Sequence, residues 1–148
     1  MNIAREVPQS VQVIERMLME GFATGNADVV DELCSPEMVE HQFGLSGTGR
    51  EAIDKVKRGI ADVFRAMPDI RFTIGDWSAH GDTAWVRAEA TATQTGPFVG
   101  PASGRPVVFT VIDVARVVDG RIVEHWGVPD RFAILAQTGQ LSRNTEHV

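Results

Sequence analysis

The chain has 148 residues, 43% of them hydrophobic, and a formal net charge of -6 at pH 7. This length and hydrophobic content predict one globular domain over residues 1–148, ordered over about 8–139 and frayed over 140–148. The acidic balance argues against nucleic acid or an anionic membrane as a partner. A single cysteine, the lack of an apolar leader and the lack of a run of about 20 apolar residues predict a cytoplasmic protein.

The first half of the chain has helical periodicity, with apolar residues spaced by three and four. Helices are expected over 9–25, 27–34 and 49–67. Thr48 and Glu51 have the spacing of a capping box at the start of the third helix. After Pro36, an extended stretch is expected over 38–43, and it contains His41.

The second half changes to a period of two. Four strands of an antiparallel meander are expected, over 70–77, 83–93, 106–118 and 121–128, followed by a short helix over 130–137. The intervening segment 95–106 is rich in glycine and proline, which predicts a long loop bordering a site. Helices first and a meander second predict an α+β fold, in which a curved sheet and the helices on one face enclose a cone with a pocket inside.

The turn at Asp119 and Gly120 sets an expected register for the last two strands. Without a bulge, Asp113 pairs with Trp126 and Phe109 pairs with Asp130, and these four side chains would share the pocket face. His125 would then point to the opposite face, packed or at an interface. Because both faces are largely apolar, the second face is expected to join subunits in a homodimer or a higher homo-oligomer.

Strand 83–93 alternates between two kinds of side chain. Trp85, Arg87 and Glu89 point one way, and small apolar residues point the other way. Since small residues suit close packing against a neighbouring surface, the face with Trp85, Arg87 and Glu89 is expected to look into the cone.

The order and spacing of several segments resemble the SnoaL-like polyketide cyclase family, within the group of proteins that fold like nuclear transport factor 2. These segments are VEH at 39–41, MPDIRF at 67–72, GDTAWVRAEAT at 81–91, GPFVGPASGRPVVFTVIDVARVVDGRIVEHWGVPD at 96–130, and the closing AILAQTG.

The resemblance implies an intramolecular aldol ring closure of a hydrophobic small molecule, without metal or cofactor. It implies an acid/base residue at Asp130, four residues after Trp126. In the family's cyclases a histidine on the third meander strand supports this acid, and Arg116 is expected in that place here. Trp126, Phe109 and Asp113, with Trp85 and Arg116, are the expected substrate contacts.

Alternatives remain for these side chains. Asp130 also has the sequence position of an N-cap for the last helix. His41 is either a second proton-transfer group at the mouth of the cone or a half-exposed strand residue. Arg87 and Glu89 form either a structural ion pair or, with Asp113 or Asp130, the acid-Arg-acid set that limonene-type epoxide hydrolases of this fold use.

The absence of tyrosine argues against that hydrolase chemistry, because a tyrosine helps to position water in those enzymes. No group of His, Cys, Asp and Glu has metal-ligand spacing, so no metal site is expected. A third hypothesis is a module that only binds a ligand or dimerises.

Overall fold

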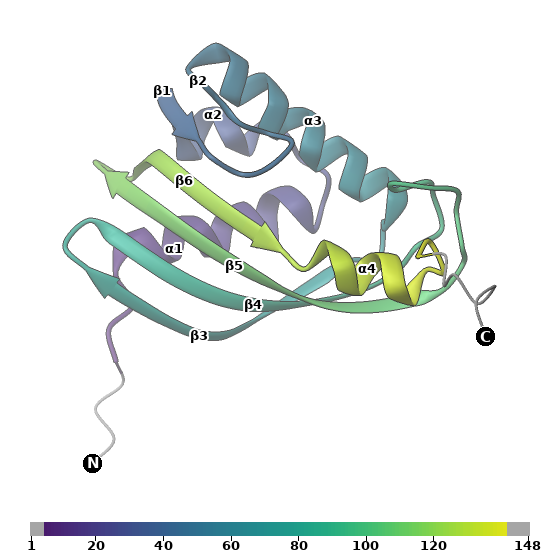
Figure 1. Cartoon of the computed structure of the whole chain (residues 1–148). Coiled ribbons are helices and arrows are strands. Elements are labelled where there is room, and N and C mark those ends of the chain that lie inside the picture. The colour runs from purple at the N-terminus through teal and green to yellow at the C-terminus, as the bar shows by residue number, and fades with distance from the viewer. Residues whose placement is uncertain (1–4, 142–148) are drawn as a thin grey trace, which may run out of the picture.

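The computed structural model describes residues 5–141 (Figure 1). The elements in chain order are α1 (Gln9–Arg16), a π-helical segment η1 (Met17–Phe22), α2 (Val29–Leu33), β1 (Cys34–Glu40), β2 (Gly47–Thr48), α3 (Arg50–Ala66), β3 (Arg71–His80), β4 (Thr83–Thr93), β5 (Pro106–Val118), β6 (Arg121–Pro129) and α4 (Arg131–Gln137). Most of the predicted tail, residues 142–148, lies outside the described residues.

The strands form one six-stranded sheet in the order β2-β1-β6-β5-β4-β3. The strands β3 to β6 are the predicted antiparallel meander, and β1 joins its β6 edge in parallel. Helices α1 and α3 lie on one side of the curved sheet, and α4 follows the end of β6 (Figure 1). The predicted α+β class, with N-terminal helices on an antiparallel sheet, is confirmed.

The helices approach the sheet closely because the strands beneath them carry small residues. Helix α1 packs on β4 and β5, where Ala84, Ala88 and Ala115 are almost completely buried. The alternation predicted on β4 is therefore present, but its assignment to inner and outer faces is wrong. Trp85 is 54% exposed on the outer face, and Arg87 and Glu89 are exposed on the same side.

The predicted pairing of β5 with β6 is also wrong beyond the first two pairs. Val118 pairs with Arg121 as expected, but the register shifts between Val117 and Arg116, so Asp113 lies opposite Gly127 instead of Trp126. One extra residue in β6 makes this β-bulge. Because side chains alternate along a strand, the shift moves every later residue of β6 to the face opposite the predicted one.

The start of α3 also differs from its prediction. Its N-cap is Gly49, with a positive φ of 64° and no side-chain capping bond, so the expected capping box does not form.

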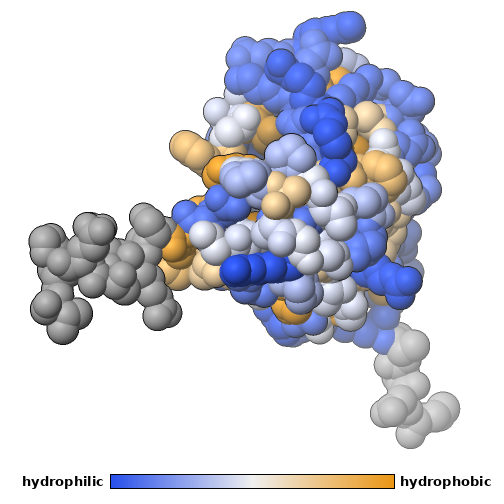
Figure 2. All heavy atoms as spheres, turned by 90° about the vertical axis from the view of Figure 1, so that its right-hand side faces the viewer, coloured by the Kyte–Doolittle hydropathy of each residue, from blue (hydrophilic) through white to orange (hydrophobic). Residues whose placement is uncertain are grey.

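The end of the molecule on which α4 lies is mostly hydrophilic, with apolar side chains between the polar ones (Figure 2). Among residues 5–141, no helix combines the length and the apolar character needed to cross a bilayer.

Candidate functional site

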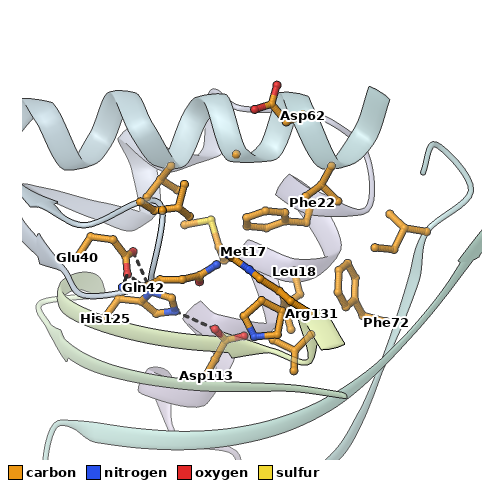
Figure 3. A pocket seen from close by; sticks show the side chains of 18 of the residues that line it. Met17, Leu18, Phe22, Glu40, Gln42, Asp62, Phe72, Asp113, His125 and Arg131 are labelled. Atoms are coloured by element: carbon orange, nitrogen blue, oxygen red, sulfur yellow. Dashed lines mark hydrogen bonds and ion pairs between the residues drawn. The ribbon is translucent and has the colours of Figure 1, made fainter. Parts of the chain in front are cut away.

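A cavity of about 290 Å³ lies between the inner face of the sheet and the helices. Most of its lining is apolar and comes from elements far apart in the chain, including Met17, Leu18 and Phe22 of η1 and Phe109 of β5 (Figure 3). π-helical turns occur often at functional sites. The predicted loop 95–106 borders the cavity as expected, since Phe98 and Val99 line it.

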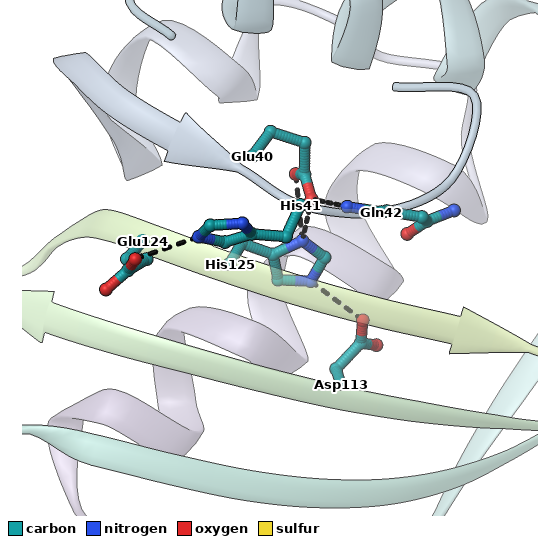
Figure 4. Close-up of polar contacts among 6 residues, drawn as sticks. All are labelled: Glu40, His41, Gln42, Asp113, Glu124 and His125. Atoms are coloured by element: carbon teal, nitrogen blue, oxygen red, sulfur yellow. Dashed lines mark hydrogen bonds and ion pairs between the residues drawn. The ribbon is translucent and has the colours of Figure 1, made fainter. Parts of the chain in front are cut away.

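One end of the cavity is polar and contains an acid-His-acid set (Figure 4). His125 lies between two carboxylates: its Nδ1 is 2.8 Å from both oxygens of Glu40, and its Nε2 is 2.8 Å from Oδ1 of Asp113. The backbone N–H of Gln42 also donates to Glu40, at 2.9 Å. All three side chains of the set are largely buried, with exposed fractions of 2% for Glu40, 8% for Asp113 and 16% for His125.

Strand pairing between distant parts of the sequence assembles this set. Glu40 at the end of β1 is the register partner of His125 in the parallel pair with β6. His125 pairs with Ala115 of β5, which makes Asp113 its diagonal neighbour two residues along the strand. The bulge in β6 is required for this contact, because in the unshifted register His125 would point to the outer face.

The two carboxylates determine the charge of the histidine. Burial by itself lowers the pKa of His125, but hydrogen bonds to Asp113 and then Glu40 outweigh burial and raise the pKa to about 10. At neutral pH His125 is therefore an imidazolium that donates from both nitrogens. It cannot act as a base there, and its role is to hold the two carboxylates.

Asp113 keeps one oxygen available for chemistry. Only Oδ1 is bonded to His125, and Oδ2 has no hydrogen-bond partner within residues 5–141. Every fully buried side-chain N or O atom of these residues has a partner, so Oδ2 is accessible. Since Asp113 lines the cavity, this oxygen is open to a bound molecule.

Two further polar side chains line the cavity, the Gln42 amide and the Arg131 guanidinium. The Gln42 amide lies over Gly127, where an added Cβ would overlap its Oε1 and would come within 2.9 Å of His125 Cε1. Arg131 Nη2 donates to the carbonyl of Phe43 at 2.7 Å. Gly127 thus leaves the space in which Gln42 sits beside His125.

The single cysteine also lines the cavity. Cys34 is buried, with an exposed fraction of 2%. Burial, with a smaller contribution from Glu40, raises the pKa of this thiol to about 12. The thiol is therefore protonated at neutral pH and has no nucleophilic character there. Within residues 5–141, no cluster of His, Cys, Asp and Glu side chains could hold a metal ion.

Asp130 does not lie in the cavity, so its predicted placement is wrong. It is exposed and is the N-cap of α4, where Oδ1 accepts a hydrogen bond from the backbone N–H of Ala133 at 3.0 Å. The alternative function considered for Asp130, a helix cap, is the one that the structure gives it. The bulge explains the difference, because the unshifted register would have placed Asp130 opposite Phe109.

His41 lies on the outer side of the sheet and not at the mouth of the cone. Its ring stacks on Trp126, with the ring centres 4.6 Å apart, and its Nε2 is 2.8 Å from Glu124. Trp126, 37% exposed, shares this outer position. Arg116 also belongs to this cluster, since its Nε is 3.6 Å from Glu124 and its Nη1 is 3.9 Å from Asp82.

Seven predicted site residues therefore lie outside the cavity. Asp130 caps α4, and the other six lie on the outer side of the sheet: His41, Trp85, Arg87, Glu89, Arg116 and Trp126. Phe109 and Asp113 line the cavity as predicted. Sequence reasoning missed Glu40, Gln42 and Arg131, and it placed His125 on the wrong face. For Glu40 and Gln42, the only signal in the sequence is the segment EHQ at 40–42. Its three polar residues stand together in the predicted extended stretch 38–43.

Comparison with known proteins supports the same fold. IdmH of Streptomyces antibioticus, a candidate polyketide cyclase, is 33% identical; the match covers 89% of this chain and 99% of IdmH, with a TM-score of 0.72. TsrD of Streptomyces laurentii is 26% identical over 93% of this chain and 100% of TsrD, with a TM-score of 0.78. A candidate polyketide cyclase of Acidithiobacillus ferrooxidans is 25% identical over 96% of this chain and 100% of that one, with a TM-score of 0.76.

A search of curated proteins found no significant match. The model of the family described as SnoaL-like polyketide cyclase matches residues 12–138. This match spans almost all of the described residues and includes every member of the acid-His-acid set. The resemblance noted in the sequence is therefore confirmed, and the chain belongs to the SnoaL-like polyketide cyclase family.

Proposed function

We propose that the protein is a cofactor-independent acid/base enzyme that closes a ring in a hydrophobic carbonyl compound, with Asp113 as the catalytic acid/base. The observation that carries the proposal is the accessible Oδ2 of Asp113 at the polar end of an apolar cavity. The cavity volume, about 290 Å³, is near the lower end of the usual range for ligand pockets, about 300–1,000 Å³.

The proposed reaction uses one proton and no oxidant or reductant. Asp113 Oδ2 takes a proton from a carbon next to a carbonyl group, and the carbanion attacks a second carbonyl carbon of the same molecule. A carbon-carbon bond forms while the C=O π bond breaks, and the resulting alkoxide takes the proton back from Asp113. The carboxylate is then regenerated, and the product is a cyclic β-hydroxy carbonyl compound.

His125 and Glu40 are positioning residues in this scheme. The imidazolium holds Oδ1 of Asp113 and so orients Oδ2 toward the cavity. Glu40 holds the other side of the ring with both of its oxygens. A side chain held in one rotamer by such contacts loses little freedom when the substrate binds, and this preorganisation favours reaction.

The first step can be tested without knowing the natural substrate. We would incubate the protein with 2-tetralone, a small hydrophobic ketone, in D₂O and follow the loss of its α-proton signals by NMR. The protein should accelerate this exchange, and Asp113→Asn should reduce the acceleration by about 10²- to 10⁴-fold. Since Asn removes the base but keeps the shape, circular dichroism should show an unchanged fold.

Asp130→Asn is the matched control, because it makes the same chemical change at an exposed position. Asn caps a helix about as well as Asp, so this variant should fold and should exchange protons at the wild-type rate. If Asp130→Asn lost exchange while Asp113→Asn kept it, the assignment of the acid/base residue would be wrong.

The two other hypotheses have less support. Arg87 and Glu89, which the epoxide hydrolase hypothesis requires, lie on the outer face and do not line the cavity. A purely structural module would not need an open cavity with an accessible carboxylate. If hydrophobic ketones bind but neither the wild type nor Asp113→Asn exchanges their protons, the cavity only binds ligands.

A further inference from the structure

Arg131 is a cation at the cavity without an acidic partner. It is half-buried and lines the cavity as the first residue of α4. None of the acidic residues within 5–141 forms an ion pair with it. Its only hydrogen bond to these residues runs from Nη2 to the carbonyl of Phe43, so Nε and Nη1 are available to donate.

The Gln42 amide is a second available donor on the same side of the cavity. The backbone N–H of Gln42 is bonded to Glu40, but its side-chain amide has no hydrogen-bond partner within residues 5–141. The Oε1 atom of this amide lies over Gly127, close to the His125 ring. Figure 3 shows the side chains of Gln42 and Arg131 both directed into the cavity, above Asp113 in that view.

The acidic side chains that line the cavity have partners other than Arg131. Glu40 and Asp113 are both bonded to His125, and Asp62 pairs with Arg65 at 3.3 Å. A ligand that fills the cavity removes water from the guanidinium of Arg131. Removing water from a cation without supplying an acceptor is unfavourable, so a ligand with an anionic oxygen near Arg131 binds better than a neutral one of the same shape.

We propose that Arg131 and the Gln42 amide form a subsite for an anionic oxygen of the ligand. The oxygen belongs either to a carboxylate that the ligand carries or to the enolate that Asp113 creates by removing a proton. The enolate source rests on the proposed function, whereas the carboxylate source does not. A charge-assisted, bidentate contact to a planar oxygen group is the interaction that Arg makes best.

The test compares two probes of nearly the same shape, the neutral 4-nitrobenzamide and the anionic 4-nitrobenzoate. Calorimetric titration at pH 7 should show that the wild type binds the benzoate about tenfold more tightly or better. Arg131→Gln should abolish this preference, Arg131→Lys should keep part of it, and Gln42→Ala should weaken it. Arg50→Gln removes the same charge from an exposed position and should leave the preference unchanged.

A second probe reports on an enolate-like oxygen. The absorbance of 4-nitrophenol reveals its ionisation, so a titration of the bound probe measures its pKa directly. The wild type should lower the pKa of bound 4-nitrophenol relative to the free compound, and Arg131→Gln should remove the shift. If the protein prefers 4-nitrobenzoate but leaves the pKa of bound 4-nitrophenol unchanged, the subsite binds a ligand carboxylate. If it lowers the pKa of bound 4-nitrophenol but does not prefer 4-nitrobenzoate, the subsite binds the enolate.

Phe43→Ala separates recognition from loop positioning. The guanidinium lies 5.3 Å from the centre of the Phe43 ring and also bonds its carbonyl, so Arg131 also positions this segment. Phe43→Ala removes the ring but keeps the charge and the carbonyl, and it should keep both anion effects. Their loss in Phe43→Ala and in Arg131→Gln alike would overturn the proposal, because loop position would then explain them.

Failure of either proposal can be recognised separately. The subsite is refuted if neither probe shows an effect that depends on Arg131. For the first probe pair, this means that the wild type binds 4-nitrobenzamide and 4-nitrobenzoate equally, binds neither, or keeps its preference in Arg131→Gln. For the second probe, it means that the pKa of bound 4-nitrophenol does not depend on Arg131. Asp113-dependent exchange of 2-tetralone protons would then still support the proposed function. An Arg131-dependent preference for 4-nitrobenzoate without any exchange would support the subsite and count against the proposed function.

Discussion

The imidazolium at the polar end of the cavity makes the stability of the protein depend on pH. In the unfolded chain His125 has its ordinary pKa of about 6.5, whereas the pKa in the folded protein is about 10. Since the pKa is raised on folding, the stabilisation is fully present below pH 6.5 and is lost as the pH rises through 10. A shift of this size corresponds to about 5 kcal/mol of the free energy of unfolding.

The slope is the measurable quantity. Between these two pKa values the folded protein holds one more proton than the unfolded chain, so the free energy of unfolding falls by about 1.4 kcal/mol per pH unit. Urea unfolding at pH 7, 8 and 9 should therefore show a loss of about 3 kcal/mol in total. The series ends at pH 9, because the ordinary pKa of the Cys34 thiol lies there, and its rise to about 12 on folding adds a similar loss above that pH.

Two variants test whether this slope comes from His125. His125→Gln should be less stable, because it leaves two buried carboxylates without a cation, and it should show little change between pH 7 and 9. His80→Gln changes an exposed histidine and should keep the wild-type slope. A flat wild-type profile, or the same slope in His125→Gln, would refute the proposed ionisation, as would an imidazole NMR titration with a midpoint near pH 7.

Two further predictions concern packing. Gly127→Ala places a methyl group where the Gln42 amide lies and within 2.9 Å of His125 Cε1. This variant should lower the free energy of unfolding in urea by about 1–3 kcal/mol and should slow 2-tetralone exchange. An unchanged free energy of unfolding together with an unchanged exchange rate would show that Gln42 does not pack there. The outer face of the sheet exposes the large apolar residues Trp85, Val108, Ile112, Trp126 and Val128, and we propose that it joins two copies of the chain in a homodimer. Sedimentation velocity should show a dimer for the wild type and a monomer for Val128→Lys, and a wild-type monomer at micromolar concentration would count against this interface.

Local patterns in the sequence predicted the elements well. The observed bounds of β4 and β5 are those of the predicted strands 83–93 and 106–118, and β6 and α4 differ by one residue. Turn residues and the change of period from 3.6 to two determine such boundaries, and both can be found within a short window. The short helix α2 and the π-helical end of the first helix were less well predicted, because packing against α3 and the sheet determines their form.

The two faces of β4 could be separated from the sequence but not assigned. Alternation divides Trp85, Arg87 and Glu89 from the small residues, yet either set can face the helices. Charge decides the matter in the folded protein: two buried charges on β4 would need partners beneath α1, whereas alanines allow the helix to approach. The parallel pairing of β1 with β6 lies beyond any local pattern, and for this reason Glu40 was missed.

The bulge in β6 connects the error in the predicted register to the chemistry of the site. In the unshifted register, Trp126 and Val128 would point inward and would occupy space that is now part of the cavity. The extra residue, Val123, instead turns His125, Gly127 and Pro129 toward the helices. Two large apolar side chains are thereby exchanged for an imidazole, a glycine and a proline. A single inserted residue thus opens space for a ligand and also places His125 against Asp113, so the volume of the cavity and its acid/base end have the same structural cause.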